Sequence, residues 1–269
     1  MRQILRDHDV SLIFHLAAQA GVRHSLEKPL KYVHNNILGF ATMVEAAVSE
    51  NVRNIIYASS SSVYGDSKVV PYTEDLPVNR PLSIYAATKS ANELYAYAAS
   101  SLNRLVMTGV RFFTVFGPWG RPDMAYYLFA DKIMKGETIR LRGNGNMRRD
   151  HTFIDDVVEG LRRLYEDYKN KSANTASSFG EHTIYNIGYG QPVSTHSIVL
   201  TLEALLEKKA IVEYVDEQQG EPLQTYADSS KMETHYGFLP RTDFQAGMKA
   251  FTEWYLRYTN GHGVQERKE

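Results

Sequence analysis

Three short apolar runs, separated by helical segments, limit the fold of this chain more than any other feature of its sequence. The runs are Ser11–Ala18, Val52–Ser59 and Leu105–Phe113. Continuous apolar runs of this length are typical of strands buried on both faces of a parallel sheet. The segments between them, Leu30–Glu50 and Leu82–Leu102, are predicted to be helices. This alternation predicts right-handed βαβ units, and therefore an α/β fold with a doubly wound parallel sheet.

The sequence changes in character after the turn Gly117–Gly120, where shorter elements follow one another. The polar stretch Lys171–His182 is predicted to be a loop. Four further helices and two short strands are predicted, at Met124–Lys135, Ile154–Lys169, Thr195–Leu206 and Phe244–Tyr258, and at Thr183–Ile187 and Ile211–Tyr214. These elements indicate a smaller mixed α/β region after the parallel sheet.

The composition of the 269 residues excludes several classes of protein. A net charge of −1 gives no support for nucleic-acid binding, which needs a clear basic excess. The chain has no cysteines, so disulfides and thiolate chemistry are excluded. No signal-like apolar core opens the chain, and no segment has about 18 consecutive apolar residues. We therefore expect a soluble, cytoplasmic protein without nucleic-acid or membrane partners.

Tyr85 and Lys89 stand four residues apart at the start of a predicted helix, so they share one face of it. A lysine ammonium close to a tyrosine hydroxyl lowers the pKa of the tyrosine, which can then serve as a general base near neutral pH. A serine at the end of a neighbouring strand could hydrogen-bond the same substrate oxygen, and Ser59–Ser62 follows such a strand. The alternative is a surface pair whose stems pack together. The strand that ends in serines, about twenty residues earlier, favours the functional interpretation.

Six strings, in order along the chain, make this sequence resemble an extended short-chain dehydrogenase/reductase of the nucleotide-sugar epimerase kind. They are "FHLAAQAGVRHS" (14–25), "NNILG" (35–39), "YASSSSVYG" (57–65), "YAATKSANE" (85–93), "RFFTVFGPWGRPDMA" (111–125) and "MRRDHTFIDDVVEG" (147–160). The subfamily that it resembles most is UDP-glucuronate 4-epimerase, through "AAQAGVR" and "GPWGRPDMA". Related dehydratases carry an Asp-Glu pair, and related decarboxylases a glutamate, where this chain has Ser61 and Ser62. The resemblance therefore favours epimerisation over elimination.

The resemblance implies an NAD cofactor and a UDP-sugar substrate. Its mechanism is hydride removal from C4 to NAD, rotation of the 4-keto sugar, and return of the hydride to the opposite face. Tyr85 is expected to be the base, Lys89 to hold the nicotinamide ribose, and Ser60 with Ser62 to hydrogen-bond the 4-oxygen. The remaining expected positions are Leu16, Ala17, Ala18, Gln19, Asn35 and Phe113 around the cofactor, and Thr114, Arg121 and Arg149 around the substrate, with Arg149 at the diphosphate.

Arg121 is expected to bind a sugar carboxylate. A guanidinium holds a carboxylate through two parallel hydrogen bonds, which a lysine cannot match. The 4-keto form of a uronic acid is a β-keto acid that loses carbon dioxide readily, so a fixed carboxylate favours epimerisation. The alternatives are an ordinary salt bridge at Arg121, or a 4-epimerase that acts on a neutral UDP-sugar. Arg148 and Arg149 could likewise be a solvated basic pair.

Other polar residues are not expected to take part in the chemistry. Asp155 and Asp156 fit the first turn of a helix, where acidic residues are favoured, and Asp150 is given no catalytic role. His15, inside a strand, is interpreted as a packed core histidine. No cluster of histidines or carboxylates has convincing metal-ligand spacing.

A feature of the family has no counterpart in the first thirteen residues. Family members open with a strand, a Gly-x-x-Gly-x-x-Gly turn and a helix that hold the pyrophosphate, within on the order of 60 residues before the string at Phe14. Without them the Ser11–Ala18 strand is expected to lie at an exposed edge of the sheet. The chain could be a fragment of an epimerase, could recruit the segment from another chain, or could be a catalytically inactive remnant that binds nucleotide sugars.

The resemblance also implies an organisation. Residues 1–117 are expected to be the remaining part of an NAD-binding Rossmann domain. Residues 118–269 are expected to form mainly the substrate domain, with some segments returning to the first. Family members often dimerise through two helices of each subunit, here 30–50 and 82–102. Uronate epimerases supply galacturonate for surface polysaccharides.

Overall fold

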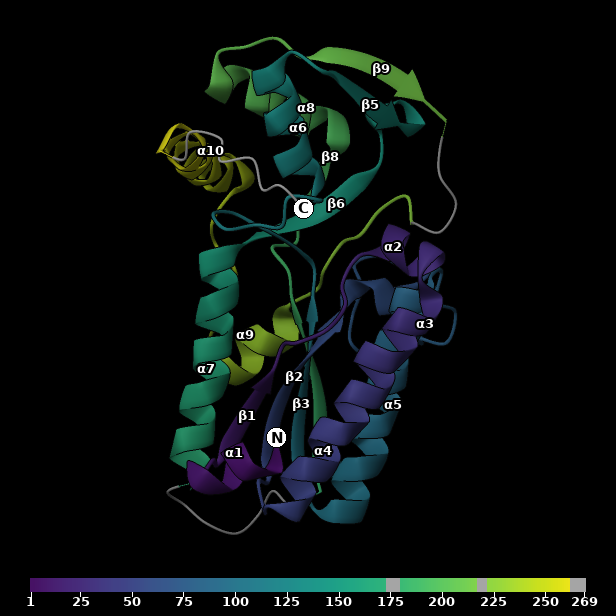
Figure 1. Ribbon diagram of the computed structural model, residues 1–269, viewed down its shortest axis with the longest axis vertical. Helices are drawn as coiled ribbons and strands as arrows, with labels where there is room; N and C mark the ends of the chain where they lie inside the picture. Colours follow the sequence, from purple (N-terminus) through teal and green to yellow (C-terminus); the bar gives the residue numbers. More distant parts are fainter. Residues whose placement is uncertain (173–179, 217–221, 262–269) are drawn as a thin grey trace.

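The computed structural model describes residues 1–172, 180–216 and 222–261. In this part of the chain a four-stranded parallel sheet has the order β1-β2-β3-β7 (Figure 1). The strands are β1 (Leu12–His15), β2 (Asn54–Ser60), β3 (Val106–Phe112) and β7 (His182–Ile187). The central strands are mainly apolar, as the sequence predicts, because helices cover both of their faces. The α/β fold with a doubly wound parallel sheet is thereby confirmed.

Alternate residues of the strands face different helices. Ile55 packs in a cluster with Phe40 of α4 and Ala96 of α5, whereas Ile56 packs with Val157 of α7 and Met232 of α9. The helices on the first face are α4 (Gly39–Ser49) and α5 (Ile84–Asn103), and those on the second are α7 (Ile154–Ser172) and α9 (Ser230–Tyr236). Both layers are visible in Figure 1, with α4 and α5 on one side of the sheet and α7 on the other.

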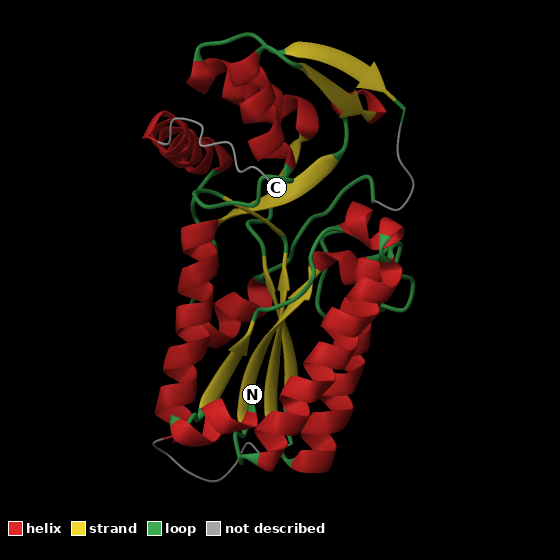
Figure 2. Ribbon diagram, in the orientation of Figure 1, coloured by secondary structure: helices red, strands yellow, loops and turns green. Residues whose placement is uncertain are grey.

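A smaller α/β region lies beyond the carboxyl ends of these strands (Figure 2). It contains the sheet β4 (Thr114–Phe116), β6 (Arg148–Phe153) and β8 (Pro192–Ser194), and the parallel pair β5 (Thr138–Arg142) and β9 (Ile211–Val215). Its helices are α6 (Ala125–Lys135), α8 (Thr195–Leu206) and α10 (Phe244–Gly261). Phe116, Ile139, Leu202 and Phe251 belong to its buried core. This core is separate from the two that sandwich the main sheet.

The predicted elements occur where the sequence placed them, with three differences. Three helices, α1 (Arg2–Asp7), α2 (Val22–Glu27) and α9, were not predicted. The predicted helix Leu30–Glu50 is built from α3 (Pro29–Tyr32), the π-helical turn η1 (Val33–Leu38) and α4. Within the predicted loop Lys171–His182, residues 173–179 lie outside the described part, and β7 begins at its last residue. The division into domains at residue 117 stays a prediction.

Strand β1 lies at an edge of the four-stranded sheet and is only partly buried. It is four residues long, shorter than the predicted run. Phe14 is 39% exposed and Leu16, just after the strand, is 49% exposed. The exposed apolar edge that the sequence predicts is therefore present in the structure. Among the described residues, no helix is both long enough and apolar enough to span a membrane.

Candidate active site

Tyr85 and Ser60 meet where the carboxyl end of β2 faces the first turn of α5. The side chain of Ser83 caps that helix by accepting a hydrogen bond from the Ala86 amide at 3.1 Å. Ser60 ends β2, and its hydroxyl accepts a hydrogen bond from the amide of Ser62 at 3.2 Å. The Tyr85 phenol lies close enough to the Ser60 hydroxyl for that hydroxyl to lower its pKa. Ser62 is half-buried in the 3-10 turn η2 (Ser61–Tyr64) that follows.

Lys89 lies one helical turn after Tyr85, and its side chain is buried, with 3% of the residue exposed. Its ammonium donates a hydrogen bond to the Ala58 carbonyl at 2.7 Å. Burial lowers the pKa of Lys89 to about 8, although the charge of Glu93 acts in the opposite direction. No carboxylate in the described part of the chain forms an ion pair with this ammonium.

The direction of the Tyr85 pKa differs from the prediction. Burial raises the pKa of Tyr85 above its ordinary value, while the hydrogen bond with Ser60 and the charge of Arg121 lower it. Lys89 does not produce the expected lowering, because desolvation of the phenol outweighs the charges around it and the Lys89 ammonium is directed at Ala58. The phenol is therefore harder to ionise than that of an exposed tyrosine.

Asn35, expected at the cofactor site, has an exposed side chain, and its role stays a prediction. The buried amide belongs to its neighbour Asn36, which is 1% exposed. The Asn36 side chain exchanges hydrogen bonds with the backbone of Gln19, at 2.8 and 3.0 Å, and donates to the Thr88 hydroxyl at 3.0 Å. Asn36 therefore joins the loop after β1 to the residue that precedes Lys89 in α5.

The remaining residues predicted around the cofactor lie at the ends of β1 and β3. Leu16, Ala17 and Ala18 are exposed after β1, and Gln19 is half-buried. Phe113, just after β3, is buried against the rings of Tyr64 and Tyr72. These positions share one end of the sheet with Tyr85 and Lys89, because the strands are parallel.

The residues predicted around the substrate come from the smaller region. Thr114 is half-buried at the start of β4, in register with His151 of β6. Arg121 follows β4 and lies close enough to Tyr85 for its charge to lower the pKa of that phenol. Arg149 is half-buried in β6, and its Nη1 donates to the carbonyls of Arg148 at 3.0 Å and Leu223 at 3.4 Å.

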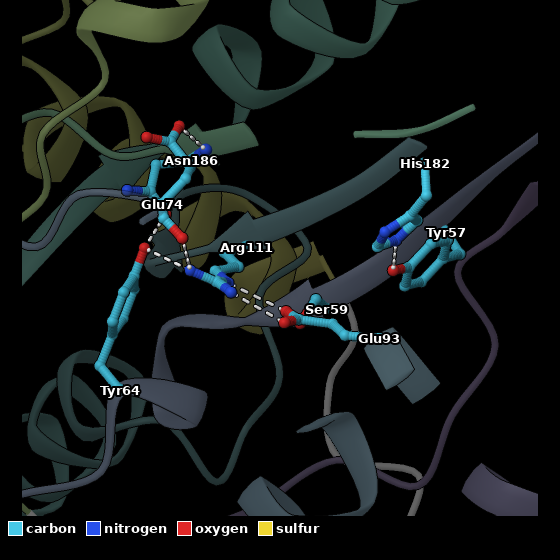
Figure 3. Close-up of polar contacts among 8 residues, drawn as sticks. All are labelled: Tyr57, Ser59, Tyr64, Glu74, Glu93, Arg111, His182 and Asn186. Atoms are coloured by element: carbon cyan, nitrogen blue, oxygen red, sulfur yellow. Dashed lines mark hydrogen bonds and ion pairs between the residues drawn. The ribbon is translucent and has the colours of Figure 1, made fainter. Parts of the chain in front are cut away.

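A buried ion pair that the sequence analysis missed lies behind Ser60. Arg111 of β3 donates from Nε and Nη2 to the two carboxylate oxygens of Glu93 in α5, at 2.9 and 2.8 Å (Figure 3). The Ser59 hydroxyl donates to the same carboxylate at 2.5 Å, and the Arg111 guanidinium lies 4.8 Å from the centre of the Tyr64 ring. The pair thus ties the end of β2 to α5, one helical turn after Lys89.

The network continues into β7 through Tyr64. Its hydroxyl accepts from Arg111 at 3.0 Å and donates to the Asn186 side chain at 2.6 Å. The backbone N–H of Asn186 donates to the Glu74 carboxylate at 2.7 Å (Figure 3). One sequence signal could have revealed this network. Arg111 is a charged residue within an otherwise apolar central strand, and a buried guanidinium needs a carboxylate partner.

The polar residues given no catalytic role have other partners. His15 is half-buried, and the centre of its ring lies 5.5 Å from that of the Phe40 ring. Burial and the charge of Lys89 lower the pKa of His15. The buried carboxylate of Asp150 accepts hydrogen bonds from the amides of Tyr189, Gly190 and Ala227. Asp155 and Asp156 stand in the first turn of α7. The described residues contain no group of three or more histidines and carboxylates that could hold a metal ion.

Comparison with known proteins agrees with this arrangement. Residues 1–188 match the model of the NAD dependent epimerase/dehydratase family. The chain is 40% identical to the protein CapI of Staphylococcus aureus, over 96% of this chain and 79% of that protein. It is 41% identical to UDP-glucuronate 4-epimerase 3 of Arabidopsis thaliana, over 93% of this chain and 60% of the plant protein.

A solved structure gives the same result. The UDP-glucuronic acid 4-epimerase of Bacillus cereus, in complex with UDP-glucuronic acid and NAD, superimposes with a TM-score of 0.85 at 31% identity, covering 96% of this chain and 78% of that one. The fold, the order of the motifs and these relatives lead to one conclusion. The chain belongs to the NAD dependent epimerase/dehydratase family, among the extended short-chain dehydrogenases/reductases.

Proposed function

We propose that this chain catalyses the NAD-dependent epimerisation of a UDP-sugar at C4, and that its substrates are UDP-glucuronate and UDP-galacturonate. The observation that carries the proposal is that Ser60 and Arg121 both lie near the Tyr85 phenol, close enough to lower its pKa. A base, a hydroxyl partner and a cation that suits a carboxylate thus meet at one end of the sheet. The relatives named for UDP-glucuronate 4-epimerase support the choice of sugar.

The residues around Lys89 fit the nicotinamide-ribose half of NAD. The Lys89 ammonium is buried and has one carbonyl acceptor, that of Ala58, so it retains donors for a ribose diol. Leu16, Ala17 and Ala18 offer a small, exposed surface beside it. When bound, NAD supplies reversible oxidation at the sugar carbon. Lys89 holds and orients the ribose, and Phe113 forms a buried wall at the end of β3.

Tyr85 and Ser60 handle the proton of the sugar 4-hydroxyl. Tyr85, as phenolate, accepts this proton as the sugar is oxidised, and returns it when the hydroxyl is formed again on the opposite face. The Ser60 hydroxyl fixes the same oxygen by a hydrogen bond, and Ser62 is the second donor. Since burial raises the pKa of Tyr85, the charge of Arg121 and the hydrogen bond of Ser60 are what favour the phenolate.

The substrate is held on the side of the smaller region. Arg121 binds the sugar carboxylate through two parallel hydrogen bonds and fixes its orientation, which disfavours loss of carbon dioxide from the 4-keto form. Thr114 lies at the sugar and Arg149 at the diphosphate. A neutral-sugar 4-epimerase needs the same base but has no use for a carboxylate-binding guanidinium.

The function is tested with the purified chain supplied with NAD. Bound dinucleotide is released by denaturation and quantified, and UDP-glucuronate is followed for conversion to UDP-galacturonate. We expect both NAD retention and interconversion. An Arg121→Ala variant should lose uronate binding or release decarboxylated sugar nucleotide, with little effect on UDP-glucose. Retention of NAD without any turnover would make the chain a binding protein, and turnover of neutral sugars alone would replace the uronate assignment.

We also propose that two copies pair through α4 and α5, which lie side by side (Figure 1). Five large apolar side chains on α5 are exposed, led by Leu102 at 83% and Leu94 at 72%; the others are Ile84, Tyr95 and Tyr97. A stripe of this kind on a packed helix marks an interface. Light scattering should give twice the chain mass, and Leu94→Glu should give the monomer mass. A monomeric parent chain contradicts this pairing.

A further inference from the structure

Arg121 is paired with a carboxylate of its own chain. Its Nε and Nη2 each donate to one carboxylate oxygen of Asp123, both at 2.9 Å. The pairing follows from the local sequence, because Arg121–Met124 forms a turn with Pro122 in its second position and a hydrogen bond of 3.1 Å from the Met124 amide to the Arg121 carbonyl. That turn brings side chains two residues apart to the same side.

The pair faces the loop after β1 and, through it, Tyr85. A Cβ atom on Gly21 would lie 3.8 Å from Asp123 Oδ2 and 3.9 Å from Arg121 Nη2. It would also lie 3.6 Å from the hydroxyl of Tyr32, whose ring makes an edge contact with the ring of Tyr85 at 6.2 Å. The guanidinium and its carboxylate partner therefore lie near the candidate base.

The carboxylate that pairs with Arg121 can also be replaced by another at little cost. The side chains of Arg121 and Asp123 are 46% and 61% exposed. Exposed ion pairs contribute little net free energy, because water solvates both partners well. A substrate carboxylate that brings further contacts from its sugar and nucleotide can therefore take the place of Asp123 at small cost. The Asp123 side chain has solvent on its free side to turn into.

We propose that Asp123 is a stand-in for the substrate carboxylate: it occupies the two-donor edge of Arg121 until a uronate displaces it, and so it sets the preference for charged over neutral sugars. This inference rests on the proposed function, since it assigns a second residue to the same carboxylate site. It makes Asp123 a specificity-determining residue and gives it no part in the proton transfer.

The test is a comparison of binding in the NAD-supplied chain, with Tyr85→Phe as the parent so that the ligand is not converted. Calorimetry gives the affinities for UDP-glucuronate and for UDP-glucose. Asp123→Asn should raise the ratio of the two affinities about two- to fivefold in favour of UDP-glucuronate, the size expected for loss of an exposed competing pair. Combined with Arg121→Gln, the same change should leave the ratio unaltered.

Glu213→Gln is the matched control, because Glu213 is an exposed carboxylate paired with Arg140 on the β5–β9 strands. The ratio of the affinities for UDP-glucuronate and UDP-glucose should be the same in Glu213→Gln as in the parent. The proposal is overturned if Asp123→Asn selectively weakens the binding of UDP-glucuronate, since Asp123 would then support Arg121. It is also overturned if the affinities for both ligands change equally. Failure to bind UDP-glucuronate at all overturns this proposal and the proposed function together. If UDP-glucuronate binds selectively but the chain with Tyr85 intact does not convert it, the proposed function alone is overturned.

Discussion

A single hydroxyl group distinguishes Tyr85 from phenylalanine, and that hydroxyl lies near Ser60 and Arg121. We expect Tyr85→Phe to lower turnover by about 10²–10⁴-fold, the range for loss of a positioned base. The free energy of unfolding should change by about 1 kcal/mol or less, since one hydrogen bond is lost and the ring stays. The measurements are turnover of UDP-glucuronate in the NAD-supplied chain and a denaturant titration.

Tyr97→Phe makes the same chemical change on the exposed side of the same helix, where Tyr97 is 67% exposed. This control should keep its turnover. Turnover of Tyr85→Phe at the rate of the control would remove Tyr85 from the mechanism.

Single residues also show where prediction from the sequence stops. The strings around Ser60, Tyr85 and Lys89 could be assigned because their spacing within one strand end and one helix is a local property. Asn35 and Asn36 could not be told apart, because the π-helical turn η1 shifts which of two neighbours faces the protein interior. The direction of the Tyr85 pKa was missed for another reason. It depends on burial by residues distant in the sequence.

At the scale of elements, the ion pair of Arg111 and Glu93 holds β2, β3 and α5 together. The two side chains are 4% and 7% exposed. Replacing Glu93 by glutamine leaves a buried guanidinium without its counter-charge, which costs about 3–5 kcal/mol in comparable buried pairs. We expect Glu93→Gln to lower the free energy of unfolding by that amount in a urea titration.

Glu159→Gln is the matched control on α7, where Glu159 pairs with Arg162 and Arg163 near the surface. Exposed pairs contribute about 0–1 kcal/mol, so this variant should unfold close to the parent. Equal effects of the two substitutions would mean that the buried pair does not hold these elements together.

The elements themselves were predictable wherever a run of apolar residues is long enough to bury, as for β2 and β3. Helix α8 was predicted with its observed bounds. Helices α1 and α2 are only six residues each, too short to show a helical period. The buried polar network joins residues from five separate segments, and no local pattern reports that kind of proximity.

At the scale of the whole molecule, acid stability depends on a neutral histidine inside the smaller region. His151 is 3% exposed, donates from Nδ1 to the Arg149 carbonyl at 2.9 Å, and has its pKa lowered by burial to about 4. The unfolded chain binds this proton near pH 6.5, so the stability that neutral His151 contributes is present above that pH and is lost as pH falls. The loss from this residue between pH 7 and pH 5 is roughly 2 kcal/mol.

His151→Gln keeps a hydrogen-bond donor without a titrating group. We therefore expect the unfolding free energy of this variant to decrease less between pH 7 and pH 5 than that of the parent, by roughly 2 kcal/mol. The adjacent Asp150 acts with the opposite sign, because burial raises its pKa to about 6. The difference between parent and variant, measured by urea titration at pH 7 and pH 5, isolates the histidine. Parallel pH dependence in both proteins would show that His151 is not held neutral.

The whole molecule was predictable as a parallel sheet followed by a smaller region, since strand and helix alternate along the first half. How the smaller region meets the sheet was not, because that contact joins loops such as those at Gly21 and Arg121 without a shared pattern. The exposed position of β1 did follow from the sequence, through the comparison with the longer family pattern.

The π-helical turn at Val33–Leu38 gives this chain an unusual sensitivity to length. Such a turn accommodates one residue more than a regular α-helix, so deletion of one residue there would relax the segment into a continuous helix. The helix would survive, and the segments on either side of the turn would keep their relative orientation, because the turn absorbs the extra residue locally. Only the side chains within the turn would change direction. Asn36 is one of them, so an improvement in the helix would come at the expense of the contacts by which Asn36 joins the loop after β1 to the helix that carries Lys89.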